Sequence, residues 1–497
     1  MRKPVRFILI LLILGPAFVS ADTGKWHFFD KKPVEVYLTG RFDILDLAGL
    51  KIDIDSVRDN VVLAYVTEEE FKTLQSRGVY INWVPDAEKI TRDLQLQTTR
   101  SSQQIKTGEF YHTYEELSAE LQAVASDNPD LCLLESAGQT VQGRELWWIK
   151  ISDNVDTEEE EPEFHYIATM HGNEPVGTEL CLRLINYLVD YYNVSPRITE
   201  LINNTEIWIM PLMNPDGYTA GSRYNANGVN LNRNFPDQVA DPVNTTAGRE
   251  PETTAIMNWA LMHSPTLSAN FHSGALVVSY PWDGRIDIDG DDNPDLNPDN
   301  DLFVNISEAY AILNEPMYNG QFYHGISIGQ QWYPIYGGMQ DWAYVWIGCN
   351  EVTIELHDTK WPDPSLIPVI WEDNREAMIT YIEQSHIGIR GVVTDAVTGT
   401  PIPAEVCVNG IDHSVYTDPQ VGNYHRMLLP GAYTLNFYAD GYISQEREIT
   451  VMPGAAAILD VQLLTGNTKT GGGGGCFVGV VIGKEPKKVS MFQSGNN

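Results

Sequence analysis

The stretch Phe164-His-Tyr-Ile-Ala-Thr-Met-His-Gly-Asn-Glu-Pro175 decides how the middle of the chain folds. Its apolar first half, Phe164–Met170, predicts a buried strand, and the segment Gly177–Tyr192 predicts a helix soon after it. His171 and Glu174 are therefore expected at the turn between a strand and a helix. Interleaved strands and helices predict an α/β domain with a mixed central sheet that helices cover. The other predicted strands are Leu146–Ile151, Glu206–Met210, Leu267–Phe271 and Val352–Leu356, and the other predicted helices are Tyr114–Ala125 and Pro251–Met262.

Two smaller regions flank this domain. After Ser385, short strand candidates separated by Gly, Pro and Asp turns predict an all-β domain. Near the start, apolar runs such as Val34–Leu38 and Val61–Val66 and a helical segment near Glu68–Arg77 predict a small α+β unit of βαβ type. The expected parts are a signal peptide (1–21), an N-terminal accessory or propeptide-like domain with its linker (22–107), the α/β domain (108–385), the β domain (386–465) and a Gly-rich tail (466–497).

The first 21 residues have the composition of a secretory signal. Basic Arg2 and Lys3 precede an apolar run, Phe7–Leu14, and Val19-Ser20-Ala21 offers a small-residue cleavage site. No later stretch reaches the roughly 18 consecutive apolar residues of a membrane span. We therefore expect a secreted, periplasmic or cell-surface protein without a transmembrane span.

Composition and charge exclude several classes of protein. Of the 497 residues, 43% are apolar and 10% aromatic, which is typical of a globular protein. The chain has 32 basic and 67 acidic residues, a formal charge of −35, so it is not expected to bind nucleic acid. The five cysteines are scattered and predict no disulfide framework, although one or two bridges remain open, with Cys476 as the expected unpaired thiol.

His171, Glu174 and His272 are candidate metal ligands. The first two follow one predicted strand, and His272 ends another. Two imidazoles and a carboxylate are typical of a catalytic zinc site, which keeps one position open for water. We expect one zinc ion per chain.

Several motifs around these residues fall in the order found in one enzyme family. The chain resembles the zinc metallocarboxypeptidases over about residues 108–465, and the Gly-Gly-Met-Gln-Asp run and the appended β domain resemble the regulatory, carboxypeptidase N/E-type branch. The resemblance implies that the β domain is a transthyretin-like module without chemistry of its own. The motifs are Asn214-Pro-Asp-Gly217, Asn232-Arg-Asn-Phe-Pro236, Ser279-Tyr-Pro281, Tyr333-Pro-Ile-Tyr-Gly-Gly-Met-Gln-Asp341 and Thr353-Ile-Glu-Leu356.

The resemblance also implies roles for single residues. Glu355 matches the catalytic glutamate, which takes a proton from water and delivers it to the leaving amine. Arg223 matches the arginine that stabilises the oxyanion. Asn232 and Arg233 match the pair that binds the substrate's terminal carboxylate, and Tyr333 matches the mobile tyrosine that closes over the terminal residue.

A preference for basic substrates depends on two further matches. Asp283, eleven residues after His272, matches the acidic residue at the base of the side-chain pocket, and Gln340 matches its companion. A buried carboxylate there would pair with Lys or Arg and would reject Phe or Leu.

Three features lie outside the shared motifs. An acidic loop resembles calcium-binding loops, although it lacks a closing bidentate glutamate, so a Ca²⁺ site and a solvated loop are both open. The sequence leaves three roles open for residues 22–107: a removable propeptide, a permanent accessory domain or an inhibitor of the chain's own active site. The tail with Cys476 is a sorting signal or a flexible end. The candidate calcium ligands are Asp287, Asp289, Asp291, Asn293 and Asp295.

We therefore expect an exported zinc carboxypeptidase that acts on peptide or protein C-termini and prefers Lys or Arg. One alternative is a cell-wall peptidase that trims diaminopimelate-containing stem peptides with the same machinery. Another is an inactive surface binding protein, which usually loses a ligand or the catalytic glutamate; here every matched position is retained. The sequence leaves the oligomeric state open.

Overall fold

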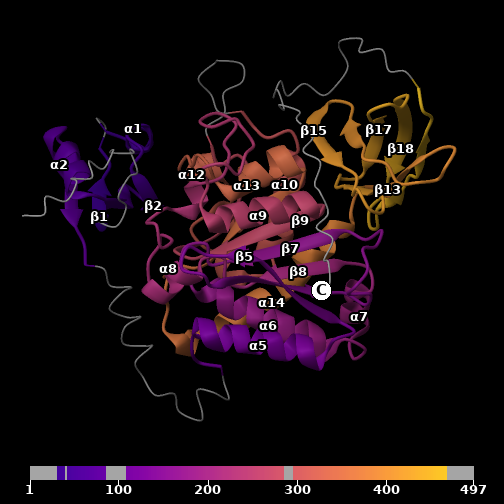
Figure 1. The fold of residues 1–497 in the computed structure, drawn as a ribbon. Coiled ribbons are helices and arrows are strands. Elements are labelled where there is room, and N and C mark those ends of the chain that lie inside the picture. Colours follow the sequence, from indigo (N-terminus) through magenta and orange to yellow (C-terminus); the bar gives the residue numbers. More distant parts are fainter. Residues whose placement is uncertain (1–30, 40–41, 86–107, 285–294, 467–497) are drawn as a thin grey trace, which may run out of the picture.

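A computed structural model describes residues 31–39, 42–85, 108–284 and 295–466 of the chain (Figure 1). The predicted signal peptide, linker and tail lie outside these residues, except for the first residue of the tail. Within the described ranges, no helix has the length and apolar character needed to cross a bilayer. Three bodies follow each other along the chain: a small N-terminal domain, a large α/β domain and a C-terminal β domain.

The α/β domain is built on one mixed eight-stranded sheet in the order β11-β10-β12-β9-β7-β8-β6-β5. Its four central strands, β12, β9, β7 and β8, are parallel, and the outer pairs β10–β12, β6–β8 and β5–β6 are antiparallel. The predicted mixed sheet is therefore confirmed. The strands are β5 (Cys132–Gln139), β6 (Glu145–Ile151), β7 (Glu163–Ala168), β8 (Glu206–Met210), β9 (Pro265–His272), β10 (Ala275–Tyr280), β11 (Ile326–Ile328) and β12 (Asn350–His357).

Helices cover both faces of this sheet, and the central strands are buried along their length. One face packs against α5, α6 and α14, and the other packs against α9 and α13. Burial on both faces explains why β7 and β8 are apolar runs, interrupted only by a few polar side chains. The helices are α5 (Tyr114–Asp127), α6 (Val176–Tyr191), α7 (Pro196–Ile202), α8 (Pro215–Ala220), α9 (Pro251–Met262), α10 (Asn300–Ala311), α11 (Glu315–Tyr318), α12 (Gly329–Trp332), α13 (Met339–Trp342) and α14 (Ile367–Glu383).

Short single-turn helices complete the connections. They are the 3-10 helices η2 (Leu231–Arg233), η3 (Tyr323–Gly325), η5 (Pro364–Leu366) and η6 (Gln384–His386) and the π-helical turn η4 (Ala343–Ile347). Of these, η2 matters most for the site, because it carries Asn232 and Arg233.

The C-terminal domain is a β sandwich, as the sequence predicts. One sheet has the order β16-β13-β19 with β20 also beside β13, and the other has the order β15-β14-β17-β18. Phe437, Leu435 and Val406 are among the fully buried residues of its core. The strands are β13 (Ile389–Asp395), β14 (Glu405–Val408), β15 (Ile411–Tyr416), β16 (Asn423–Arg426), β17 (Gly431–Tyr438), β18 (Gln445–Val451), β19 (Ala457–Ile458) and β20 (Val461–Leu463).

A buried ion pair joins this sandwich to the α/β domain. Arg426 on β16 donates to both carboxylate oxygens of Asp299, at 2.8 and 2.9 Å, and neither side chain is exposed by more than 2%. His413 and the Tyr344 hydroxyl also contact Asp299. Arg426 and His413 lower the pKa of Asp299, although burial opposes them. The two domains therefore share a charged, fully buried contact.

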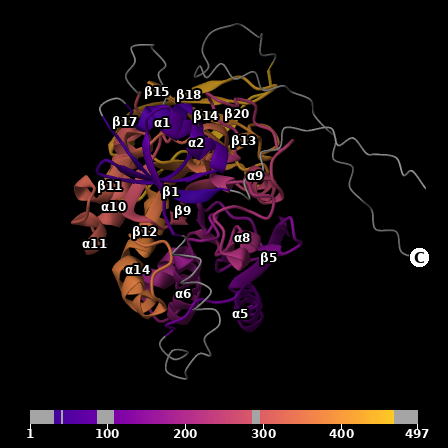
Figure 2. The ribbon, with the colours of Figure 1, turned by 90° about the vertical axis from the view of Figure 1, so that its left-hand side faces the viewer.

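The N-terminal domain is a four-stranded antiparallel sheet in the order β2-β3-β1-β4 with two helices (Figure 2). β3, α2 and β4 form a crossover around β1, but the strand β2 and the helix α1 are absent from the elements that we expect from the sequence. Strand β2, Asp-Ile-Asp-Ser-Val-Arg, has little apolar character to mark it. The elements are β1 (Lys32–Tyr37), α1 (Ile44–Gly49), β2 (Asp53–Arg58), β3 (Val61–Val66), α2 (Glu68–Ser76) and β4 (Tyr80–Trp83).

The four cysteines among the described residues are all buried free thiols. No disulfide joins any two of these four residues. Cys476 lies outside the described residues, as do four of the five candidate calcium ligands, Asp287, Asp289, Asp291 and Asn293. The calcium site therefore stays a prediction.

Candidate metal centre and substrate cleft

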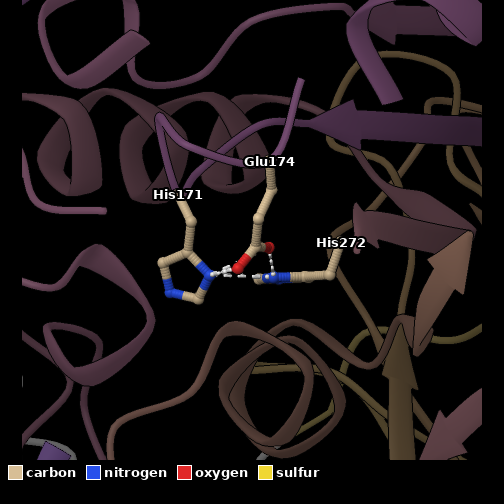
Figure 3. A group of neighbouring side chains, drawn as sticks. All are labelled: His171, Glu174 and His272. Carbon is tan, nitrogen blue, oxygen red and sulfur yellow. Dashed lines mark hydrogen bonds and ion pairs between the residues drawn. The ribbon is translucent and has the colours of Figure 1, made fainter. Parts of the chain in front are cut away.

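Three side-chain donors converge where the parallel strands β7 and β9 end (Figure 3). The Nδ1 atoms of His171 and His272 are 3.0 Å apart, and Glu174 Oε2 lies 2.8 Å from His272 Nδ1 and 3.1 Å from His171 Nδ1. All three residues are at least 97% buried. Ligands of a tetrahedral zinc ion lie about 3.3 Å apart, since each is about 2.0–2.1 Å from the metal. The spacing of these donors therefore fits a zinc ion with small adjustments.

The protonation pattern around His171 also suits a metal ligand. Asn230 Oδ1 accepts a hydrogen bond from the Asn232 backbone N–H and lies 3.0 Å from His171 Nε2, so Nε2 carries the proton. Nδ1 then has a free lone pair, and the donor-only Arg223 guanidinium lies 3.0 Å from it. Burial has the largest effect on the pKa of His171 and the positive charge of Arg223 the second largest, and together they lower it to about 3. The imidazole is therefore neutral near pH 7, and its second nitrogen is held by a neighbour.

Glu355 is placed beside the metal centre by strand register. On β12 it is paired with His272 on the parallel strand β9. Its carboxylate lines the same cleft as the three donors, and Oε2 has no hydrogen-bond partner among the described residues. Burial and the neighbouring Glu174 raise the pKa of Glu355 well above its ordinary value. A buried, unpaired carboxylate of raised pKa next to a metal centre is suited to accept and release a proton.

Arg223, Asn232 and Arg233 line the other side of the cleft. Asn230 caps the short helix η2 that carries Asn232 and Arg233. Asn232 Oδ1 accepts from the Met339 backbone N–H, and Arg233 Nη1 donates to the Asn232 carbonyl at 2.7 Å. Two guanidinium groups and an amide thus surround a space next to the metal donors, a chemistry suited to carboxylates.

Asp283 lines the same cleft, and its carboxylate forms no ion pair with any of the described residues, although the nearby Arg233 guanidinium opposes the rise of its pKa. Its backbone N–H donates to Asp341, and Gly329 packs so close that a Cβ there would lie 2.0 Å from Asp283 Oδ1. Burial and Asp341 raise the pKa of Asp283 well above its ordinary value. Gln340 is not among the residues that line the cleft; it is 1% exposed, and its amide atoms have no hydrogen-bond partner among the described residues.

The site includes residues that the motifs do not point to. Lys360 is 96% buried, and its Nζ lies 2.9 Å from Glu174 Oε1. Although burial opposes them, Lys360 and His171 hold the pKa of Glu174 well below its ordinary value. A lysine five residues after the catalytic-glutamate match is the one local signal for this contact. Asp53 and Asp55 of β2, far away in the sequence, also reach the site, and no local pattern marks them.

Tyr333 is held by that same strand. Its hydroxyl donates to the Asp55 carbonyl at 3.1 Å, and its ring belongs to the apolar cluster of the N-terminal domain. Burial raises the pKa of the Tyr333 hydroxyl. Tyr333 therefore lines the cleft, and its hydroxyl is held by the N-terminal domain, while its role as a mobile tyrosine over the substrate stays a prediction.

A second group of His and Glu side chains lies away from this cleft, and its members satisfy each other's charges and hydrogen bonds. His263 Nδ1 is 3.1 Å from Glu163 Oε2, and Glu163 Oε1 accepts from the Ser264 backbone N–H. Burial and Glu163 raise the pKa of Glu158, the third member, to about 9. A protonated glutamate beside a paired one does not need a metal ion, so the described residues favour the first group as the metal centre.

Known proteins resemble this chain in two regions. Residues 117–377 match the family described as zinc carboxypeptidase, and residues 388–464 match the carboxypeptidase regulatory-like domain. Carboxypeptidase D of Homo sapiens is 40% identical over 393 residues, which are 75% of this chain and 28% of that protein. Carboxypeptidase M of Mus musculus is 40% identical over 362 residues, covering 69% and 81%. The carboxypeptidase N catalytic chain of Rattus norvegicus is 36% identical, covering 72% and 87%.

The chain thus spans little more than a quarter of the carboxypeptidase D relatives but most of the other two. Among solved structures, carboxypeptidase A from Helicoverpa armigera superposes with a TM-score of 0.54 at 19% identity, covering 71% of this chain and 96% of that one. Thrombin activatable fibrinolysis inhibitor gives 0.53 at 18% identity, covering 71% and 98%. At these identities the structural likeness concerns the fold alone.

Proposed function

This chain belongs to the zinc carboxypeptidase family, and we propose that it hydrolyses the C-terminal peptide bond of peptides or proteins, with a preference for terminal Lys or Arg. The observation that carries the proposal is the convergence of His171, Glu174 and His272 next to Glu355, in one cleft with Arg223 and Arg233. Such a cleft combines a metal centre, a proton carrier and an anion-binding wall, which are the parts that an exopeptidase needs.

His171, Glu174 and His272 would hold a zinc ion, which would supply Lewis acidity to acidify water and polarise a carbonyl group. Glu355 takes the proton from the attacking water and returns it to the leaving amine. Arg223 donates to the oxygen on which negative charge develops, so its contribution grows toward the transition state. Asn232, Arg233 and Tyr333 bind the terminal carboxylate and so restrict cleavage to the chain end.

The preference for basic residues rests on Asp283. Among the described residues its carboxylate has no paired cation, and a terminal Lys or Arg would supply one. A Phe or Leu side chain would leave that buried charge uncompensated, which costs several kcal/mol unless the carboxyl takes up a proton. We also propose export of the enzyme, on the signal-like composition of residues 1–21.

The test uses the full chain with a specific protease site inserted between residues 86 and 107 and cut after folding, referred to below as the cleaved chain. It is incubated with blocked dipeptides ending in Arg, Lys or Phe, with and without a zinc chelator. Chelator-sensitive release of Arg and Lys is expected. Release of Phe alone would support carboxypeptidase activity but contradict the role of Asp283 in selecting basic residues. Absence of release from any dipeptide by zinc-loaded chain would reject the proposal and favour stem peptides or an inactive binding protein.

A further inference from the structure

The Asp283 loop, residues 281–284 directly after β10, is held at two anchors. The first is the Asp341 carboxylate, which accepts the backbone N–H of Asp283 and that of Gly284, each at 2.9 Å. The second is Asn297, whose Nδ2 donates to the Pro281 carbonyl at 2.7 Å. Asp341 and Asn297 are both buried, and neither is among the residues that line the cleft. The carboxylate proposed to select basic residues is therefore placed by groups outside the cleft.

Both anchors lead to one buried residue, Asp299. Its backbone N–H donates to Asn297 Oδ1 at 2.9 Å, which orients the amide of Asn297 toward the Asp283 loop. The other anchor, Asp341, lies on α13, and the chain continues from there directly into η4. On η4 the Tyr344 hydroxyl donates to Asp299 Oδ2 at 2.8 Å. Asn297 and Tyr344 thus connect the two anchors with the same residue.

Tyr344 also packs against the Asp283 loop directly. Its ring meets the ring of Trp282 edge-on, with centroids 5.3 Å apart and planes at 68°. Trp282 is the residue before Asp283, and both aromatic residues are at least 95% buried. Because protein interiors are packed as densely as organic crystals, a shift of the Tyr344 ring would displace the backbone next to Asp283.

The β sandwich holds both Asp299 and Tyr344. The ring of His413 on β15 stacks on the Tyr344 ring with centroids 3.9 Å apart, and its Nε2 donates to the Tyr344 carbonyl at 3.1 Å. His413 Nδ1 lies 3.0 Å from Asp299 Oδ2, and Arg426 on β16 donates to both oxygens of that carboxylate. His413 and Arg426 are both buried. Two residues of the sandwich therefore fix the two residues on which the Asp283 loop depends.

Selection of a basic side chain depends strongly on where Asp283 lies. A hydrogen bond between charged groups needs a separation of about 2.7–2.9 Å, whereas an aliphatic side chain makes no such bond. A displacement of Asp283 by about 1 Å should therefore weaken the binding of a terminal Arg or Lys and leave that of a terminal Leu almost unchanged. A loss of overall stability differs from this, because it lowers the activity on every substrate by the same factor. The ratio of two activities separates the two effects.

We propose that the β sandwich takes part in substrate selection: His413, acting through Tyr344 and Asp299, holds the Asp283 loop where its carboxylate can bind a terminal Lys or Arg. The sandwich supplies no reacting group, and His413 is a positioning residue in the second domain rather than a part of the cleft. The inference rests on the proposed function, because it assigns the selection of basic residues to Asp283.

The test measures kcat/KM of the zinc-loaded cleaved chain on blocked dipeptides ending in Arg and in Leu. His413→Ala is expected to lower the Arg-to-Leu ratio of kcat/KM about tenfold, with the loss falling on the Arg substrate. Tyr344→Phe keeps the ring and loses the hydrogen bond to Asp299, so it should lower the ratio in the same direction by a smaller factor.

The matched control is Asn423→Ala. Asn423 is a buried residue of the same sandwich, and its Nδ2 donates to the carbonyls of Glu159 and Glu161 at 3.3 Å. These carbonyls precede β7, at the end of the strand opposite to His171. The control thus disturbs a contact between the same two domains that does not lead to the Asp283 loop, and it should leave the Arg-to-Leu ratio unchanged.

The outcomes separate this inference from the proposed function. If Asp283→Ala lowers the Arg-to-Leu ratio and folded His413→Ala does not, the inference is overturned and the proposed function stands. Equal losses on both substrates in His413→Ala, or an equal fall of the ratio in Asn423→Ala, would also overturn it. A wild type without preference for Arg would overturn the proposed selectivity and, with it, the inference. If His413→Ala does not fold, the ratio in Tyr344→Phe decides in the same way.

Discussion

Glu355 and His272 are paired in register on the neighbouring parallel strands β12 and β9. The proposed proton carrier and one proposed metal ligand therefore lie on adjacent hydrogen-bonded strands that are buried in the sheet. In open α/β sheets, ligands bind at the carboxyl ends of the parallel strands, and His171 and Glu174 reach the same edge from the turn after β7. The proposed chemistry therefore rests on strands and the turn after β7, whereas the residues proposed to bind the substrate carboxylate lie in loops and on η2.

Removal of a metal ligand should abolish zinc binding. His272→Ala leaves two donors, and the zinc content should fall from one ion per chain to about a tenth or less. Metal analysis after dialysis measures it. His263→Ala, in the balanced group with Glu163, is the control and should keep one zinc ion. Loss of zinc from the control alone would place the metal centre in the other group.

Arg233→Ala should weaken recognition of the substrate's free carboxylate. Truncating one partner of a buried charge pair costs about 2–5 kcal/mol, so kcat/KM of the cleaved chain should fall about 30-fold to several thousandfold. Steady-state kinetics measures it. Arg249→Ala, which breaks a pair with Asp241 away from the metal donors, should change kcat/KM little. Equal losses in both variants would contradict a carboxylate clamp at Arg233.

Selectivity for basic residues should fall as the pH falls. Burial raises the pKa of Asp341 to about 7, and burial with Asp341 raises the pKa of Asp283. Because both pKa values are raised, the two carboxyls take up protons as the pH falls, Asp341 near its pKa of about 7, and their attraction for a cationic side chain decreases. The ratio of kcat/KM for Arg-ended and Leu-ended dipeptides, measured in cleaved chain between pH 8 and pH 5, should therefore decline. A constant ratio would show that Asp283 does not set the selectivity.

The buried pair between Arg426 and Asp299 should stabilise the contact between the two larger domains. Arg426→Ala removes the guanidinium partner of the buried Asp299 carboxylate, which keeps its contacts with His413 and Tyr344, and should lower the free energy of unfolding by up to about 3–5 kcal/mol. The double variant Asp299→Asn/Arg426→Met should be milder, because it leaves no bare charge.

The pH dependence of this pair has a defined sign. The pKa of Asp299 is lowered in the folded state, so its contribution is complete above the ordinary carboxyl pKa of 3.8 and is lost as the pH falls below it. Denaturant unfolding of wild type and Arg426→Ala at pH 7 and pH 3 should show a smaller difference at pH 3. A difference that is larger at pH 3 would contradict the role of the charge.

Local sequence was sufficient to predict the scaffold of the site. The apolar run before His171 and the helix after Pro175 can be read directly, because strand and helix periodicity are local properties. The same holds for Glu355 at the end of an apolar strand, and the structure brings both residues into one cleft.

Strand β2 and Lys360 could not be predicted in this way. Lys360 and Asp55 are 305 positions apart, and their contact depends on how two domains dock. The sequence around Asp55 alternates acidic and apolar residues and looks like a surface strand. The partners of its two carboxylates are cations of the α/β domain. No pattern within residues 22–107 could therefore indicate these contacts.

The measurement that tests the central claim most directly is kcat/KM of the zinc-loaded cleaved chain on a blocked dipeptide ending in Arg, for wild type, Glu355→Gln and Glu351→Gln. Glu351 lies on the same strand and is buried. Its carboxylate accepts hydrogen bonds from Ser268 and Asn270, and it is not among the residues that line the cleft. Wild type and Glu351→Gln should release Arg, while Glu355→Gln should lose about 10²–10⁴-fold with zinc still bound. Full activity of Glu355→Gln, or no activity of wild type, would contradict the account.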